Sequence, residues 1–534
     1  MKVNEEELQS LITEFVEKYK TLSTDLNDTY FQASITGDPE KYKKVGELEL
    51  ELTKVLSDSA TYAKVKAFKK GASIKNEVLA RELEVLYNSL EKYQGDEKIL
   101  EDLVKKGTAL EQKYATYRAT LNGEKIADND IDSILTKSTS NEELKAAWLA
   151  SKEIGDAVKD EVIELVKMRN ELAQSLGYNN YHQMSLSLSE QDPNQIEALF
   201  DELDELTSDS FAKLKEQMDD YFAERYKVDK NELMPWHYQN RFFQEAPQIY
   251  NTDFDAHYKG KSIEKLVDDY FKGIGLPAAD ILERSDLYEK ENKYQHAYCM
   301  HVDRSGDVRV VANIRANQQW TGTMLHELGH GVYDKFLDMD LPFLLREPAH
   351  IFTTEAIAMI FGRLATSPHW MKESLELSDE EFEAMKHDAL ASSQLQQLVF
   401  SRWSQVMFRF EKSMYENPDQ DLNALWWQLI EKYQMLTKPE GRDNADWAAK
   451  IHIAIVPCYY HNYLMGELLA SQFYAKIQNE ISPNNLSMIG DEKIGEYFKT
   501  AVFEPAALYK WNDMIEKATG EKLTAKYYAE EFVK

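Results

Sequence analysis

The feature that most constrains the fold is a helical repeat of apolar residues that recurs along most of the chain. Near the start it appears at Leu8, Ile12 and Phe15, and similar spacing covers residues 140–176 and 193–226. Residues that interrupt helices are scarce, because the 534 residues include only 21 Gly and 13 Pro. The sequence therefore predicts long amphipathic helices joined by short loops, in a fold that is mainly α.

One stretch departs from this pattern, between residues 294 and 312. Here β-branched and aromatic residues cluster on either side of residues 303–307, which is typical of a β-hairpin. We expect one small antiparallel sheet at this place, immediately before the next helix. The open edge of such a sheet suits the binding of an extended peptide.

The pattern H-E-x-x-H occurs at residues 326–330, in a run that is predicted to be helical. Residues four apart share one face of a helix, so His326 and His330 can direct two imidazole nitrogens at a single zinc ion. Glu327 lies beside the first histidine, where its carboxylate can act as general base toward a water molecule at the metal. Leu325 and Leu328 are expected to face the protein interior.

A third ligand is needed to distinguish a metal site from a helix with two hydrogen-bonded histidines. The pentapeptide alone arises by chance on the order of a few hundredths of a time in such a chain. Glu355 follows Pro348 in an apolar stretch that is predicted to be helical, and a carboxylate on an apolar face needs a partner. We therefore expect one Zn²⁺ per chain, bound by His326, His330 and Glu355.

Composition excludes several classes of partner. The 62 basic and 93 acidic residues give a net charge of −31, which repels nucleic acid and anionic membrane surfaces. No apolar stretch approaches the about 18 residues of a membrane span, and Cys299 and Cys458 cannot form a disulfide framework. The N-terminal sequence lacks the apolar segment of a signal peptide. We expect a cytoplasmic monomer, although a chain trimmed of its signal peptide would read the same way.

A second group of polar residues lies at 450–463. Attack on a peptide carbonyl creates an oxyanion that hydrogen-bond donors stabilise, and His452 and Tyr463 are candidates for that role. The alternative is that Tyr459, Tyr460 and Tyr463 are core residues on one side of a helix, which is the commoner use of such tyrosines.

Several motifs, in the same order along the chain, resemble those of the angiotensin-converting-enzyme-like peptidyl-dipeptidases. The family motifs H-E-M-G-H, L-R-E-G and H-E-A-I-G-D resemble H-E-L-G-H at 326–330, L-R-E-P at 345–348 and T-E-A-I-A-M at 354–359. The family's H-A-S strand and G-K-D-F-R turn resemble H-A-Y at 296–298 and G-D-V-R at 306–309. Its W-W-N-L and K-F-H-I resemble W-W-Q-L at 426–429 and K-I-H-I at 450–453. With a weaker similarity near 169–178, the resemblance extends from about 140 to 480.

The resemblance implies the same three zinc ligands and the same base, and it adds roles for other residues. His452 and Tyr463 would stabilise the tetrahedral intermediate. The scissile region of the substrate would be held by His296 and by the backbone of Ala297. The substrate's C-terminal carboxylate would be bound by three further side chains, those of Gln239, Lys450 and Tyr460.

The sequence departs from the family pattern in three places. The loop after His452 is one residue longer, so Tyr459 is an alternative to Tyr460. The family's Asp four residues after the third ligand is Met359 here, so the ligands need another hydrogen-bond acceptor to orient them. The arginines that bind an activating chloride in animal members correspond to Ile430 and Asn462, so we expect no chloride activation.

From these observations we predict a single zinc metallopeptidase domain over residues 1–534, an elongated helical body whose two halves flank a deep cleft. Within it we expect an N-terminal helical, lid-like region at about 1–135, a catalytic core at about 140–480 and C-terminal helices at 481–534. The predicted activity is dipeptidyl carboxypeptidase. The alternatives are an oligoendopeptidase of the thimet or oligoendopeptidase F kind, and a zinc-containing peptide-binding protein with little turnover.

Overall fold

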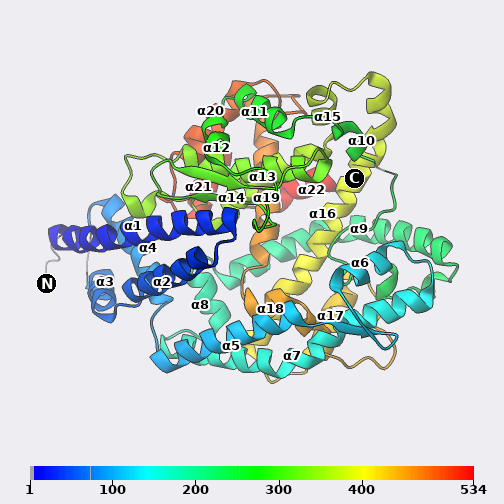
Figure 1. The fold of residues 1–534 in the computed structure, drawn as a ribbon, viewed down its shortest axis with the longest axis horizontal. Helices are drawn as coiled ribbons and strands as arrows, with labels where there is room; N and C mark the ends of the chain where they lie inside the picture. Colours follow the sequence, from blue (N-terminus) through cyan, green and yellow to red (C-terminus); the bar gives the residue numbers. More distant parts are fainter. Residues whose placement is uncertain (1–4, 72–73, 252, 534) are drawn as a thin grey trace. The chain divides into compact units, whose positions relative to one another are not determined.

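The structure is a computed structural model that describes residues 5–71, 74–251 and 253–533. Helices account for most of the described residues, which confirms the predicted mainly-α class (Figure 1). The chain forms two compact units, each assembled from separate stretches of sequence. Unit 1 consists of Met1–Gln94, Thr252–Ala389 and Met465–Tyr527, and unit 2 of Gly95–Asn251, Leu390–Leu464 and Tyr528–Lys534. The boundaries predicted near 135, 140 and 480, and the predicted cleft, stay predictions.

Unit 1 contains the metal-binding motif and one β-hairpin. Its helices are α1 (Glu5–Thr36), α2 (Pro39–Leu56), α3 (Ser59–Gly71), α4 (Glu77–Glu91), α10 (Asp255–Tyr258), α11 (Ile263–Gly273), α12 (Ala279–Arg284), α13 (Gln318–Lys335), α14 (Ile351–Gly362), α15 (Pro368–Ser374), α20 (Glu492–Phe498) and α21 (Trp511–Thr519). Its N-terminal helices share an apolar cluster in which Leu8, Leu86 and Leu90 are fully buried.

Unit 2 contains two long helices, α7 and α9, of 35 and 34 residues. Its helices are α5 (Glu97–Thr116), α6 (Asp128–Lys137), α7 (Asn141–Ser175), α8 (Tyr181–Leu188), α9 (Pro193–Tyr226), α17 (Leu422–Leu429) and α18 (Ile451–Ile455). Three more helices contribute residues to both units: α16 (Asp379–Glu416), α19 (His461–Lys476) and α22 (Lys526–Phe532). Aromatic rings fill the core of unit 2, where Trp403 and Phe410 pack edge-on against Trp426 at centroid distances of 5.8 and 5.0 Å.

The helices expected at 140–176 and 193–226 are confirmed as α7 and α9, and capping explains their ends. The Ser140 side chain accepts a hydrogen bond from the backbone of Glu143, and Asp192 caps α9 just before a proline in the first turn. Helix α19 begins at His461, after the residues at 450–460 that include Lys450 and His452. Pro457 interrupts the helical backbone before it, and Cys458 adopts a left-handed conformation with φ of 57°.

The hairpin predicted before the zinc helix is present and antiparallel. Strand β3 (Tyr298–His301) pairs with β4 (Val308–Val311), with Tyr298 opposite Val311 and His301 opposite Val308. Both strands pack against α13 (Figure 1). In the described residues β3 has no second strand partner, so its outer edge carries no further strand.

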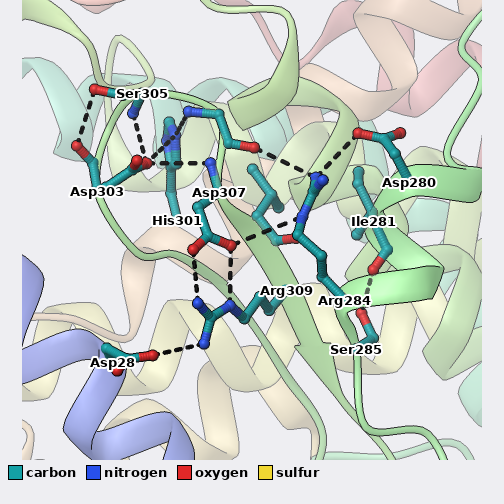
Figure 2. A network of polar contacts seen from close by, with 12 residues as sticks. Asp28, Asp280, Ile281, Arg284, Ser285, His301, Asp303, Ser305, Asp307 and Arg309 are labelled. Carbon is teal, nitrogen blue, oxygen red and sulfur yellow. Dashed lines mark hydrogen bonds and ion pairs between the residues drawn. The ribbon is translucent and has the colours of Figure 1, made fainter.

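A network of ion pairs fixes this hairpin to two helices (Figure 2). The Asp307 carboxylate accepts hydrogen bonds from Arg309 at 2.9 and 2.6 Å and lies 3.7 Å from Arg284 at the end of α12. Arg309 also donates to Asp28 on α1 at 2.7 Å. The hairpin is therefore anchored by charged groups that come from three separate segments.

A second, unexpected hairpin lies in unit 2, between α5 and α6. Strands β1 (Ala119–Leu121) and β2 (Glu124–Ile126) are joined by Asn122 and Gly123, with φ of 54° and 85°. An Asn-Gly pair with positive φ is the usual two-residue hairpin turn, so the sequence carried a signal for it. The predicted single sheet is thus one of two.

None of the helices in the described part of the chain is both long and apolar enough to cross a lipid bilayer.

Candidate metal centre and substrate-binding residues

The first element of the metal centre is α13, which carries the H-E-L-G-H motif. The Asn317 side chain starts this helix by accepting a hydrogen bond from the backbone of Trp320 at 2.8 Å. Leu325 and Leu328 are fully buried, as predicted. Because they anchor one face of α13, His326 and His330 project from the adjacent face toward α14.

The second element is α14, which supplies Glu355 and lies unusually close to α13. A side chain at Gly329 would place its Cβ 2.8 Å from the Cα of Ala358 and 3.1 Å from the carbonyl oxygen of Ile357. Real Cβ atoms do not approach backbone this closely. Glycine at position 329 therefore lets the two helices come near enough for their side chains to share one ion.

His326, His330 and Glu355 are brought together, with one possible ligand atom from each lying within 4.8 Å of the others. The Glu355 carboxylate lies 3.6 Å from His326 Nε2 and 3.8 Å from His330 Nε2. His330 Nδ1 lies 2.7 Å from Thr354 Oγ1, so with its proton on Nδ1 it donates to that hydroxyl and turns Nε2 to the shared point. Thr354 is the orienting acceptor that Met359 does not provide.

The protonation states of these groups suit a divalent cation. Burial lowers the pKa of His326 to about 4 and that of His330 to about 3, so both imidazoles are neutral, the form that binds metal. Burial raises the pKa of Glu355 to about 7. Two neutral nitrogens and a half-buried carboxylate on facing helices form a typical zinc donor set.

Glu327 lies next to this donor set and is only 9% exposed. Burial, and next the nearby Glu355 carboxylate, raise the pKa of Glu327 to about 7, while a hydrogen bond from the backbone of Cys299 opposes the rise. The contact with Cys299 holds the Glu327 carboxylate against strand β3. The candidate base and the open strand edge are thus neighbours.

Two further charged residues beside the centre were not identified from the sequence. Arg363 donates to the Glu467 carboxylate at 2.9 Å and to the Glu467 carbonyl at 3.1 Å. Burial lowers the pKa of His326 and raises that of Glu355; the Glu467 carboxylate opposes the first shift and adds to the second. The preceding residue, Gly466, allows this approach, because a Cβ there would lie 3.3 Å from Cβ of Glu355. No local pattern connects residues this far apart in sequence.

The residues expected to hold the scissile region lie at the start of strand β3. His296 is exposed and packs edge-on against Tyr294 at a ring distance of 5.4 Å, and Ala297 directly precedes the strand. Their position at the open edge agrees with contact to an extended peptide.

Lys450 and its surroundings lie in unit 2. Lys450 is 8% exposed, and its ammonium donates to Gln244 Oε1 at 2.5 Å. It also lies 5.3 Å from the ring of Phe242 and 5.5 Å from that of Tyr460. Burial lowers the Lys450 pKa to about 8, helped by Arg241 and opposed by Glu245. In the described part of the chain Lys450 has no ion pair.

Gln239, the glutamine expected beside Lys450, lines a cavity that Lys450 also lines, but its side chain bonds to another part of the loop. Its φ is 61°, and its side-chain oxygen accepts a hydrogen bond from the backbone of Gln248 at 2.9 Å. Gln244, five residues later, is the one that contacts Lys450. The sequence offered both glutamines in one loop and gave no means of choosing between them.

The three tyrosines and His452 form one aromatic cluster in unit 2. Tyr460 is 7% exposed and accepts a hydrogen bond from Trp403 at 2.8 Å. The rings of Tyr459 and Tyr463 pack edge-on, with their centroids 5.3 Å apart. His452 packs against Tyr460 at 5.2 Å. Burial lowers the His452 pKa to about 4, and its Nδ1 is buried with no hydrogen-bond partner in the described residues.

Comparison with known proteins places this arrangement in a family. The family model described as angiotensin-converting enzyme, peptidase family M2, matches residues 2–532. Angiotensin-converting enzyme of Haematobia irritans exigua is 23% identical over 476 residues, covering 80% of this chain and 76% of that protein. The enzyme of Rattus norvegicus is 24% identical over 377 residues, covering 65% of this chain and 28% of the rat protein.

Similarity extends to a relative whose name describes it as inactive. The protein named inactive angiotensin-converting enzyme-related protein, from Caenorhabditis elegans, is 24% identical over 226 residues, or 40% of this chain and 24% of that protein. This chain retains both histidines and both glutamates of its motif region on the facing helices α13 and α14. With a match over nearly its whole length, the chain belongs to the angiotensin-converting enzyme family of zinc metallopeptidases.

Proposed function

We propose that this metallopeptidase removes dipeptides from the free C-termini of oligopeptides. The observation that carries this proposal is Lys450, a cation that is 8% exposed at the wall of a cavity and forms no ion pair in the described part of the chain. Buried charges are almost always paired, so a ligand is expected to supply the missing anion. The terminal carboxylate of a peptide is such an anion.

Gln244 replaces Gln239 in our assignment of the carboxylate-binding group. It already contacts the Lys450 ammonium at 2.5 Å, and its amide nitrogen is available to donate to the second carboxylate oxygen. Tyr460 borders the same ammonium, but its hydroxyl is engaged with Trp403. We therefore retain Tyr460 as a neighbour of the bound carboxylate, with Tyr459 as the alternative.

The roles in catalysis follow from the chemistry of each group. A zinc ion held by His326, His330 and Glu355 supplies Lewis acidity toward the scissile carbonyl and makes water nucleophilic near neutral pH. Glu327 accepts the proton of the attacking water and then transfers it to the leaving amine. His452 and Tyr463 take the role that the family resemblance gives them, donation to the oxyanion.

The backbone at Ala297 and the exposed ring of His296 would hold the peptide in an extended form. Pairing with an open strand edge uses main-chain hydrogen bonds, which accept almost any sequence. This mode of binding suits a peptidase that acts on peptides of varied sequence.

Mass spectrometry of the products from a mixed peptide library, with and without a chelator, tests the proposal. We expect C-terminal dipeptides whose release stops when zinc is removed. Internal fragments would show an oligoendopeptidase instead. Peptide binding without products, in a preparation shown to contain zinc, would show a binding protein.

The predicted cytoplasmic location and monomeric state also stay proposals. Sedimentation of the purified protein measures the second, and localisation of a tagged full-length chain measures the first.

A further inference from the structure

A cavity of about 410 Å³ lies in unit 2 beside Lys450. Lys450 and Gln244 form part of its wall, and the remaining wall includes Arg241, Glu245 and two aspartates of α6, Asp128 and Asp132. A volume at the lower end of the ~300–1,000 Å³ typical of ligand pockets accepts one amino-acid residue. A residue whose carboxylate is held at Lys450 has its side chain next to this space.

Arg241 is not free to bind a ligand, because all three of its guanidinium nitrogens are engaged. Its NH1 lies 3.0 Å from Asp128 Oδ2, and its Nε and NH2 lie 2.8 and 3.1 Å from the two oxygens of Asp132. The bidentate contact with Asp132 is the strong form of such a pair. An acidic side chain entering the cavity would have to displace one of these aspartates.

The charges of the cavity wall sum to an excess of negative charge. Three carboxylates, those of Asp128, Asp132 and Glu245, face two cations, Arg241 and Lys450. Glu245 forms no ion pair with any residue that the structure describes. Once a substrate carboxylate neutralises Lys450, Arg241 is the remaining cation among three carboxylates. A second positive charge would relieve this imbalance.

We propose that this cavity receives the side chain of the substrate's C-terminal residue and selects a basic one, arginine or lysine. The proposal rests on the proposed function, because it needs Lys450 to hold the adjacent carboxylate. Glu245 and Asp128 are the residues that determine the preference. They act by charge, whereas the size of the cavity admits neutral residues as well.

The test uses peptides that differ only in the C-terminal residue: arginine, its uncharged isostere citrulline, or glutamate. Dipeptide release measures kcat/KM, and calorimetry with the Glu327→Gln variant measures Kd without turnover. We expect arginine to exceed citrulline by about tenfold in both, because two exposed carboxylates each contribute a factor of about two to five, and citrulline to exceed glutamate. Equal values for arginine and citrulline would overturn the proposal.

Substitutions of single carboxylates show which residues produce the preference for arginine over citrulline. Glu245→Gln and Asp128→Asn should each reduce the arginine-to-citrulline ratio by a factor of about two to five. Asp130→Asn is the matched control: it removes the same charge from the same helix, but Asp130 is exposed and lies outside the cavity wall, so the ratio should not change. An equal reduction in all three variants would indicate a general field and contradict the assignment to the cavity.

Failure of this inference and failure of the proposed function give different results. Dipeptides released from the citrulline peptide, with no preference for arginine, would leave the proposed function intact and remove the specificity. Internal fragments from every peptide would remove both. Since Glu245 is exposed, the Glu245→Gln variant tests the cavity even if Asp128→Asn does not fold.

Discussion

The metal centre of unit 1 and the Lys450 cavity of unit 2 differ in how the chain assembles them. The metal-binding groups come from two consecutive helices, α13 and α14, and lie between His326 and Glu355. The cavity wall collects residues from Tyr114 to Ile451, which come from four α-helices, a 3-10 helix, one strand of a hairpin and a loop. The metal-binding residues thus lie in one short segment of sequence, while the residues that we propose select the substrate are distributed along the chain.

The largest expected effect concerns the metal centre. Glu327→Gln preserves shape but removes the basic carboxylate, so kcat should fall by about 10²–10⁴, the usual contribution of a general base. Zinc content, measured by elemental analysis after dialysis, should not change. Glu355→Gln should lower zinc content instead. Loss of zinc in Glu327→Gln would mean that this residue is a ligand.

The corresponding change in the Lys450 cavity should affect only the recognition of the terminus. An amidated C-terminus leaves the Lys450 ammonium without a counter-charge, at a cost of roughly 2–5 kcal/mol in transition-state binding. Lys450→Ala should lower kcat/KM for free-acid peptides and reduce the difference between acid and amide. If the unmodified enzyme cleaves both forms equally, Lys450 does not read the carboxylate.

Recognition of the substrate carboxylate at Lys450 is expected to depend on pH in a way that can be measured separately from the chemistry at the metal centre. Burial lowers the Lys450 pKa to about 8, so the protonated form that pairs with a carboxylate disappears as the pH rises above that value. The ratio of kcat/KM for acid and amide substrates should fall by about tenfold per pH unit above 8. Ionisations common to both substrates cancel in this ratio. A ratio that stays constant between pH 7 and 10 would contradict the assignment.

Close packing of α13 on α14 predicts a smaller effect, on stability. A Cβ at Gly329 would lie 2.8 Å from Ala358 Cα, so Gly329→Ala should lower the free energy of unfolding by about 1–3 kcal/mol and weaken zinc binding. Gly322→Ala, on the same helix, is the control, because its Cβ meets its nearest neighbours at 3.5 Å. Denaturant titration of both variants with and without zinc measures the difference. Equal stability would show that the helices can separate freely.

The smallest expected effect is that of chloride. Asn462 is 4% exposed and accepts a hydrogen bond from Gln191 at 2.8 Å, and Ile430 is 6% exposed. Neither side chain carries the charge of the family's chloride-binding arginines. Activity should be the same in chloride and acetate buffers of equal ionic strength. A several-fold activation specific to chloride would mean that other cations bind the anion.

The same contrast explains which parts of the molecule the sequence could predict. Helices α7 and α9 carry long apolar repeats with capping residues, and Glu355 stands out as an acid in an apolar helix. These signals are local. Thr354 as the acceptor for His330, and Arg363 with Glu467, depend on helix packing that no short pattern encodes.

The loop that contains Gln239 and Gln244 shows why the cavity was less predictable. Gln239 and Phe243 adopt positive φ of 61° and 49°, which residues of these types rarely do, so no periodicity indicates where their neighbours point. The choice of Gln244 over Gln239 is made by tertiary contacts. The hairpin at Asn122 and Gly123 is the opposite case, since an Asn-Gly pair indicates a two-residue hairpin turn from the sequence alone.

The turn of the β3–β4 hairpin has a consequence for the entropy of peptide binding. Asp303 accepts hydrogen bonds from the backbone of Ser305 and Asp307 at 2.8 and 3.1 Å, and His301 accepts one from Gly306 at 3.0 Å. These bonds immobilise the turn when the protein folds, before any ligand is present. A peptide that pairs with β3 meets an edge whose backbone has already lost its freedom, so only the peptide's own chain must become ordered. Such an edge can bind short, flexible peptides that a mobile loop would release.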